Sequence, residues 1–287
     1  MDIGIGLPAT IPGVDRDSLL EWSGRADRRG FSSLGVIDRI VYPNYEPLVA
    51  LAAAAAVTER IRLTTAILIG PYRANTALLA KQVATVDSLS AGRLVLGIAI
   101  GAREDDYEAG GVPMEGRGRR LDQQLDELKR LWGGEKRGFA GGVGPPPARE
   151  GGPPVILGGT VDAAFRRAAR YGDGWIMGGG SPEDFGAGAE KARQAWSQHG
   201  REGDPRLMAL CYFALGDAAA QAADSYLHDY YAFAGEYADQ IAAGAATDEE
   251  TIQGYVSGFA EAGCHELICF PCSKDPAQVD LLADAVL

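Results

Sequence analysis

Apolar residues along this chain follow two alternating patterns. Residues 63–68 and 94–100 are runs of β-branched and apolar residues, which are typical of strands buried on both faces of a parallel sheet. Between them, apolar residues recur every three or four positions over 78–89, and Gly92 follows where a helix C-cap is expected. The stretch 61–101 therefore predicts a strand–helix–strand unit, and the ends of such strands are where these folds place their chemistry.

The same alternation continues over the rest of the chain. Strands are predicted at residues 3–7, 33–37, 63–68, 94–100, 155–157, 174–177, 207–215 and 266–270. Helices are predicted at about 15–29, 47–58, 78–89, 118–132, 162–171 and 182–199, with two or more within 217–263 and a last one at 276–286. Eight strands, each followed by helix, predict an α/β fold with a single (β/α)8 TIM barrel over residues 1–287.

A doubly wound sheet is the competing architecture. That fold usually carries a GxGxxG turn after its first strand, whereas the turn here reads LPATIPG, so the barrel is favoured. Residues 133–154 are rich in Gly and Pro and predict a long surface excursion after the fourth helix. The sequence leaves open whether this excursion is a lid.

Charge and hydropathy exclude some partners. The formal net charge of −12 counts against nucleic acid or an anionic membrane, because both require a basic face. No segment approaches the roughly 18 continuous apolar residues of a transmembrane helix. The beginning, MDIGIGLP, lacks the basic and long apolar regions of a signal peptide. We therefore expect a cytoplasmic protein.

Cysteine and histidine positions predict no metal site. Cys264, Cys269 and Cys272 are close in sequence but form no CxxC pair, and Cys269 lies inside an apolar run. The three histidines have no motif spacing to one another. We expect buried free thiols, and a histidine-based metal hydrolase is not expected.

Two glycine-rich turns each join a predicted strand to a predicted helix. The first glycine turn (158–160) follows the fifth strand, and the second glycine turn (178–180) follows the sixth. Their residues are Gly158, Gly159, Thr160, Gly178, Gly179 and Gly180. Glycine lets backbone N–H groups approach an anion closely, and each turn precedes a helix N-terminus. The two turns therefore predict a site for a phosphate group.

Four segments resemble the bacterial luciferase-like family of flavin-dependent oxidoreductases. They are ERIRLTTAILIGP (59–71), LAKQVATVDSLSAGRLVLGIAIG (79–101), DDYEAGGVPMEGRGRRLDQQLDELKRLW (105–132) and PVILGGTVDAAFRRAARYGDGWI (154–176). The resemblance covers nearly the whole chain. It implies a TIM barrel that binds a reduced flavin, FMN or the deazaflavin coenzyme F420, at its C-terminal mouth, with the flavin phosphate in the two glycine turns.

The resemblance also implies ring contacts at the ends of the early strands. In this family a cis peptide bond often lies behind the flavin ring, and the matching bond here is Ala66–Ile67. The cofactor-binding residues expected on this basis, in addition to the glycine turns, are Leu7, Thr65, Ala66, Ile67 and Gly101.

Four polar residues after the second and fourth strands are the catalytic candidates. They are Asp38, Arg39, Arg103 and Tyr107. The family often has Asp-His at positions 38 and 39, so Arg39 removes an obvious general acid or base and supplies a fixed cation. Arg39 is expected either to hold negative charge on a substrate or cofactor or to pair with Asp38 or another acid. The acids at 104–106 are expected to cap a helix.

Two further departures from the family concern the reaction. Ala99 stands where luciferases have a reactive cysteine, and Ala102 stands where a deazaflavin-dependent sugar-phosphate dehydrogenase is expected to have glutamate. The expected function is an oxidoreductase or monooxygenase that uses reduced FMN, supplied by a separate flavin reductase, for O2 activation or hydride transfer to a small organic substrate. The alternatives are an F420-dependent oxidoreductase, a non-catalytic flavin-binding protein, and a flavin-free hydrolase or aldolase.

An alanine run at 52–56 lies in the second predicted helix. Alanine allows helices to approach one another closely. In the family, the second and third helices often form the dimer contact, so the resemblance implies a homodimer through this region.

Overall fold

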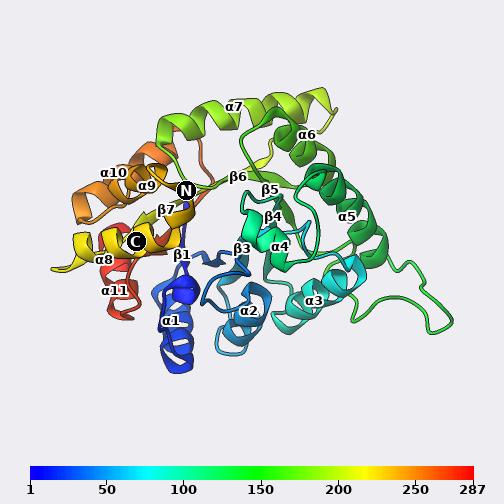
Figure 1. Ribbon diagram of the computed structural model, residues 1–287, viewed down its shortest axis with the longest axis horizontal. Coiled ribbons are helices and arrows are strands. Elements are labelled where there is room, and N and C mark those ends of the chain that lie inside the picture. The colour runs from blue at the N-terminus through cyan, green and yellow to red at the C-terminus, as the bar shows by residue number, and fades with distance from the viewer.

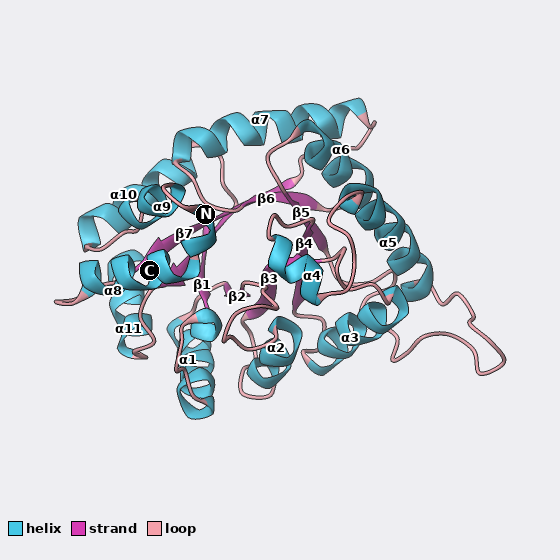
Figure 2. Ribbon diagram, viewed as in Figure 1, coloured by secondary structure: helices cyan, strands magenta, loops and turns pink.

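Eight parallel strands form a closed barrel in the computed structural model, which describes residues 1–287 (Figures 1 and 2). The strands are β1 (Asp2–Gly6), β2 (Ser33–Val36), β3 (Arg62–Ile69), β4 (Leu94–Ala99), β5 (Val155–Gly158), β6 (Gly174–Met177), β7 (Arg206–Phe213) and β8 (Glu266–Pro271). Each strand pairs with the next in sequence, and β1 pairs with β8 to close the ring. The predicted α/β fold with a (β/α)8 TIM barrel is confirmed.

Most of the helices surround the barrel on its outer side (Figure 2). The α-helices are α1 (Arg16–Arg29), α2 (Pro47–Ala55), α3 (Thr76–Leu89), α4 (Glu104–Ala109), α5 (Arg117–Trp132), α6 (Asp162–Tyr171), α7 (Pro182–Gln198), α8 (Ala219–Tyr230), α9 (Tyr237–Ala243), α10 (Glu249–Glu261) and α11 (Ala277–Val286). Two short 3-10 helices are η1 (Pro8–Thr10) and η2 (Ala232–Ala234). None of these helices combines the length and the hydropathy that crossing a membrane requires.

Local sequence signals explain where several helices begin. The side chains of Asp15 and Asn75 accept hydrogen bonds from backbone amides in the first turns of α1 and α3. Ser181 and Asp184 form a capping box at the beginning of α7. At its other end, α1 stops at Gly30, which has a φ of 91° that favours glycine. These caps account for the close agreement with the predicted helix boundaries.

The structure adds detail to the sequence prediction in the segments that follow β4 and β7. The acids at 104–106, expected to cap a helix, form the first turn of α4, a short helix that was not among the predicted helices. The region 217–263, where two or more helices were expected, contains α8, η2, α9 and α10. The four cysteines are buried, as expected.

The Gly/Pro-rich excursion at 133–154 connects the end of α5 to the beginning of β5. It therefore leaves the barrel at the end where the strands begin, and Figure 1 shows it projecting beside α3 and α5. Lys81 on α3 donates to the carbonyl of Gly144, and the Asp87 carboxylate accepts from the amide of Ala148. The excursion is thus fixed to α3 at the barrel end opposite the C-terminal mouth, and it does not cover that mouth.

A buried carboxylate lies where β8 begins. The Glu266 side chain is only 1% exposed and accepts hydrogen bonds from Arg62 at 3.1 Å and from Arg206 at 2.6 Å. The hydroxyl of Ser32 donates to the same carboxylate at 2.6 Å. Since β8 pairs with both β1 and β7, this cluster joins several strands at the N-terminal end of the barrel.

Candidate active site

An irregularity in β3 shapes the interior of the barrel mouth. The register between β3 and β4 shifts between Thr65 and Leu68, and the Ala66–Ile67 peptide bond is cis, as the resemblance implied. The Thr65 hydroxyl donates to the carbonyl of Gly97 on β4 at 2.6 Å and fixes the two strands at this point. The bulge presents Ala66 and Ile67 to a cavity.

This mouth cavity has a volume of about 270 Å³ and lies at the C-terminal ends of the strands. Its apolar lining residues are Ile37, Ala66, Ile67, Ile69 and Leu210, and its aromatic lining residues are Tyr72, Tyr107, Tyr212, Tyr230, Tyr231 and Phe233. A small set of polar residues, Asp38, Arg103 and Asp106, completes the wall together with Gly101, Ala102 and Gly178. Mostly apolar walls with few polar groups are typical of small-molecule sites.

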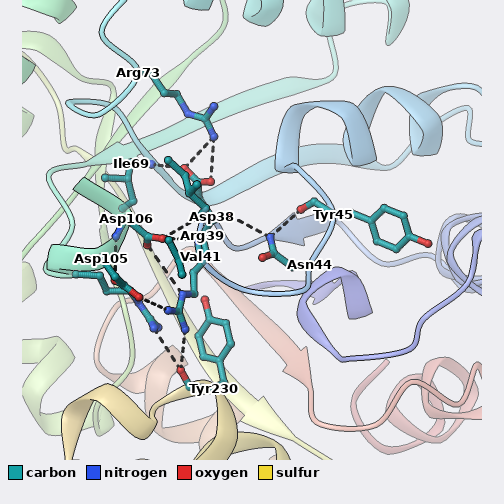
Figure 3. A network of polar contacts seen from close by, with 12 residues as sticks. Asp38, Arg39, Val41, Asn44, Tyr45, Ile69, Arg73, Asp105, Asp106 and Tyr230 are labelled. Carbon is teal, nitrogen blue, oxygen red and sulfur yellow. Dashed lines mark hydrogen bonds and ion pairs between the residues drawn. The ribbon is translucent and has the colours of Figure 1, made fainter. Parts of the chain in front are cut away.

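Asp38 lies at the wall of the mouth cavity, but a protein cation already holds it. Its carboxylate accepts two hydrogen bonds from Arg73, at 2.9 and 3.0 Å, and a third from the amide of Ile69 (Figure 3). Burial raises the pKa of the Asp38 carboxyl above its ordinary value, while Arg73, the Tyr72 hydroxyl and the Ile69 amide oppose this shift. Asp38 therefore fixes the segment after β3 to the segment after β2.

Arg39 does not line the mouth cavity. Its side chain is only 7% exposed, and its guanidinium donates to Asp105 at 2.9 Å and to the carbonyl of Tyr230 at 3.4 Å (Figure 3). Pairing with Asp38, one of the expected alternatives, does not occur. Arg39 instead pairs with another acid, Asp105, because the segment after β2 folds against the first turn of α4.

Asp106 completes this polar network. Its carboxylate accepts hydrogen bonds from the amides of Ile40 and Val41, both at 2.8 Å (Figure 3). In addition to their place in the first turn of α4, Asp105 and Asp106 therefore hold the loop after β2 in place beside the mouth cavity.

Arg103 and Tyr107 both reach the mouth cavity. The guanidinium carbon of Arg103 lies 3.9 Å from the ring centre of Phe233 and 4.7 Å from that of Tyr230. The Tyr107 hydroxyl donates to the carbonyl of Ile100, and burial raises the pKa of Tyr107 to about 12. Tyr107 is therefore a protonated group at neutral pH whose hydroxyl already has a protein partner.

The two glycine turns lie beside a second pocket of about 370 Å³, which Thr160, Gly179, Gly180 and Lys191 help to line. Because Gly178 lines the mouth cavity and Gly179 lines this second pocket, the second glycine turn lies between the two. The two helix ends differ: α7 is capped by Ser181 and Asp184, whereas the N-cap of α6 has no side-chain hydrogen bond. Each helix has an acid in its first turn, Asp162 in α6 and Asp184 in α7, but only Asp184 is hydrogen-bonded to its helix end, so the backbone amides of α6 are the more accessible to an anion.

The structure brings some predicted residues to the mouth cavity and not others. Those at the cavity are Asp38, Arg103, Tyr107, Ala66, Ile67, Gly101 and Gly178. Leu7, Thr65, Gly158 and Gly159 lie outside its lining. Gly158 is nevertheless packed directly behind it, because a Cβ there would lie 2.6 Å from the side chain of Ile67.

Sequence reasoning missed most of the aromatic wall. Tyr212 lies on β7, while Tyr230, Tyr231 and Phe233 lie at the end of α8 and in η2. The hydroxyls of Tyr212 and Tyr231 are 2.7 Å apart, while burial and the nearby Asp38 carboxylate raise the pKa of Tyr72. The aromatic sequence YYAF at 230–233 was the available signal, and only the fold shows that it returns to the mouth.

Comparisons with known proteins agree with this geometry. A family model described as luciferase-like monooxygenase matches residues 1–262. An uncharacterized protein of Mycobacterium tuberculosis is 34% identical over 188 residues, covering 56% of this chain and 65% of that protein. An FMNH(2)-dependent dimethylsulfone monooxygenase of Pseudomonas putida is 29% identical over 167 residues, covering 54% of this chain and 46% of that protein.

A solved F420-dependent secondary alcohol dehydrogenase, in complex with an F420-acetone adduct, has a similar fold. Its TM-score is 0.84 at 18% identity, with 99% of this chain and 98% of that chain covered. At this identity the likeness concerns the fold alone. The alignment to the mycobacterial relative spans less than two thirds of its length.

Proposed function

The chain belongs to the luciferase-like monooxygenase family, and on that premise we propose that it is an oxidoreductase that binds a reduced flavin-type cofactor in the mouth cavity. The observation that carries this proposal is the mouth cavity itself, an apolar and aromatic chamber at the C-terminal ends of the strands. When bound, such a cofactor supplies hydride transfer or the activation of O2.

The residues present fit a flat aromatic ring. A volume of about 270 Å³ lies just below the usual range of ligand sites, about 300–1,000 Å³, and Ala66, Ile67 and Leu210 offer an apolar surface. Gly178 leaves open space, since a Cβ built on it meets no atom within 4 Å.

The protein's own contribution is to position the cofactor and substrate and to exclude water. The ion pair of Asp38 with Arg73 holds the segments after β2 and β3 in fixed relation. The aromatic wall, including Tyr230 and Tyr231, shields the mouth cavity from solvent. Tyr107 remains protonated and orients the backbone at Ile100 rather than exchanging a proton.

We further propose FMN as the cofactor, with its phosphate at the first glycine turn and the uncapped N-terminus of α6. Ala102 and Arg39 depart from what a deazaflavin-dependent sugar-phosphate dehydrogenase of this family is expected to carry. The FMNH(2)-dependent monooxygenase of Pseudomonas putida supports FMN, whereas the solved F420-dependent dehydrogenase keeps coenzyme F420 as the alternative. The substrate would be a small organic molecule, and a separate reductase would supply the reduced FMN.

A fluorescence titration under anaerobic conditions, with reduced FMN and reduced F420 in parallel, tests this function. We expect saturable binding of FMN and weaker binding of F420. Saturable binding of F420 alone would mean that the deazaflavin, and not FMN, is the cofactor. If neither cofactor binds, the flavin-free alternative replaces the proposed function.

The same titration locates the phosphate when it is repeated with Thr160→Asp and its neutral isostere Thr160→Asn. A carboxylate beside the phosphate should weaken FMN binding by about tenfold relative to the amide, because like charges repel. Gly159 is a poorer position for this test. Its φ of 124° and a Cβ distance of 2.8 Å to Ala164 would strain any substitution. Equal affinity of the two Thr160 variants for FMN would show that the phosphate does not bind beside residue 160.

We also propose a homodimer through α2 and α3. Large apolar side chains are exposed on both helices, with Val49 65% exposed on α2 and Leu78 and Leu89 51% and 64% exposed on α3. We expect light scattering to report twice the chain mass of 30.2 kDa. Val49→Lys combined with Leu78→Lys should shift the mass to that of a monomer, whereas Val161→Lys, at an exposed position beside α6, should not. A wild-type monomer at micromolar concentration would contradict the dimer.

A further inference from the structure

The mouth cavity contains one cation that no carboxylate neutralises. The two carboxylates in its wall have protein partners, since Arg73 holds Asp38 and the amides of Ile40 and Val41 hold Asp106. Arg103 also lies in the wall, yet no carboxylate oxygen lies within 4.0 Å of it. Its only hydrogen bond to the protein is one from Nη1 to the carbonyl of Tyr230, at 3.3 Å. Most of the guanidinium donors are therefore free.

Three aromatic rings hold this guanidinium in place. Its central carbon lies 3.9 Å from the ring centre of Phe233, 4.7 Å from that of Tyr230 and 5.6 Å from that of Tyr231. Cation–π contacts fix the plane of an arginine and leave the N–H groups at its edge available. Phe233 is 52% exposed, which places this cage at the solvent side of the mouth cavity.

Most tyrosine hydroxyls in the wall have a polar neighbour in the protein. The Tyr72 hydroxyl lies close to the Asp38 carboxylate, Tyr107 donates to the carbonyl of Ile100, and Tyr212 pairs with Tyr231. The mouth cavity thus combines the unused donors of Arg103 with aromatic and apolar walls. A complementary ligand has an anionic acceptor group on a flat apolar body.

We propose that Arg103 determines substrate specificity and that the substrate is a small carboxylic acid with a flat apolar body. This inference rests on the proposed function, because the site is the same one. The guanidinium edge matches a carboxylate with two parallel N–H···O bonds. The aromatic wall of Tyr230, Tyr231 and Phe233 accommodates the apolar body.

A purely structural role for Arg103 makes a different prediction. In that case the arginine only joins the beginning of α4 to the end of α8 and to η2, and its removal would lower stability without changing ligand preference. Binding of a carboxylate compared with its neutral amide separates the two roles, because the amide retains the shape and loses the charge.

Calorimetric titration with benzoate and with benzamide tests the proposal. It is performed on the protein loaded with the cofactor that the fluorescence titration identifies, and on the chain alone if neither cofactor binds. We expect the wild type to bind benzoate at least about tenfold more tightly than benzamide, the range for a hydrogen bond to a charged group. Arg103→Met should reduce this ratio to about one, and Arg103→Lys should retain part of it.

Arg170→Met is the matched control, because Arg170 also stacks on an aromatic ring, that of Tyr171, on α6 and away from the mouth cavity. It should leave the ratio unchanged. A wild-type ratio near one, no benzoate binding up to about 10 mM, or an Arg103→Met variant that melts earlier but keeps its preference would each overturn the proposal. Absence of cofactor binding contradicts the proposed function instead, so the two failures are distinguishable.

Discussion

Replacing Gly97 with alanine is expected to abolish cofactor binding and to destabilise the barrel. A Cβ at this position in β4 would lie 2.0 Å from the backbone oxygen of Thr65 and 3.1 Å from the side chain of Ile67. Neither strand can yield freely, since the Thr65 hydroxyl already binds the Gly97 carbonyl. We expect a loss of about 3 kcal/mol in the free energy of unfolding, measured by urea denaturation.

The same substitution tests whether the β3 bulge forms the floor of the mouth cavity. Separating β3 from β4 would move Ala66 and Ile67, so reduced FMN should no longer bind in the fluorescence titration. Gly254→Ala on α10 is the control, because a Cβ there meets no atom within 4 Å. It should stabilise the helix by up to about 1 kcal/mol. Wild-type affinity in Gly97→Ala would mean that this bulge does not shape the ligand site.

The barrel was predictable because its signals are local. Continuous apolar runs such as 94–100 and amphipathic helices such as 118–132 identify themselves within a few residues of sequence. Capping residues such as Asp15 then set the helix boundaries. Between β7 and β8 the sequence predicted two or more helices over 217–263, but it did not give the separate boundaries of α8, η2, α9 and α10.

The sequence predicted only those site residues whose position along a strand places them at the mouth. Ala66 and Ile67 lie in the second half of β3 and Gly101 follows β4, and the C-terminal ends of strands meet at the mouth of a barrel. The partners of the charged residues were not predictable. Arg39 pairs with Asp105, and Asp38 pairs with Arg73, across 66 and 35 residues of sequence. Those choices depend on how the loops pack, which no spacing rule encodes.

The two arginines near the mouth, Arg39 and Arg103, show the same limit of prediction from sequence. From sequence, Arg39 and Arg103 are equivalent candidates for holding a negative charge. The structure assigns Arg39 to two acids of α4 and leaves Arg103 without a carboxylate partner. The aromatic residues that surround Arg103 come from α8 and η2, more than a hundred residues later in the chain. Only the folded arrangement of segments distant in sequence therefore shows which arginine has a structural role and which is free to bind a ligand.

Replacing Glu266 with glutamine is expected to cause the largest loss of stability at the N-terminal end of the barrel. Its carboxylate is buried and accepts hydrogen bonds from Arg62, Arg206 and Ser32. Removing one member of a buried ion pair typically costs about 3–5 kcal/mol. Both arginine side chains are about one third exposed and can be hydrated, so we expect about 3 kcal/mol, measured by urea denaturation at pH 7.

This loss should depend on pH in a defined direction. Burial by itself would raise the pKa of the Glu266 carboxyl. Arg62 together with Ser32 and Arg206 nevertheless holds this pKa below its ordinary value of 4.5. A lowered pKa in the folded state stabilises the protein fully above pH 4.5, and this contribution disappears as the pH falls through the folded pKa. The difference in stability between wild type and Glu266→Gln should therefore shrink below pH 4.5. Glu261→Gln, at an exposed position on α10, should change stability by less than about 0.5 kcal/mol at any pH. A difference for Glu266→Gln that stays constant to pH 3 would show that the carboxylate charge does not stabilise the barrel.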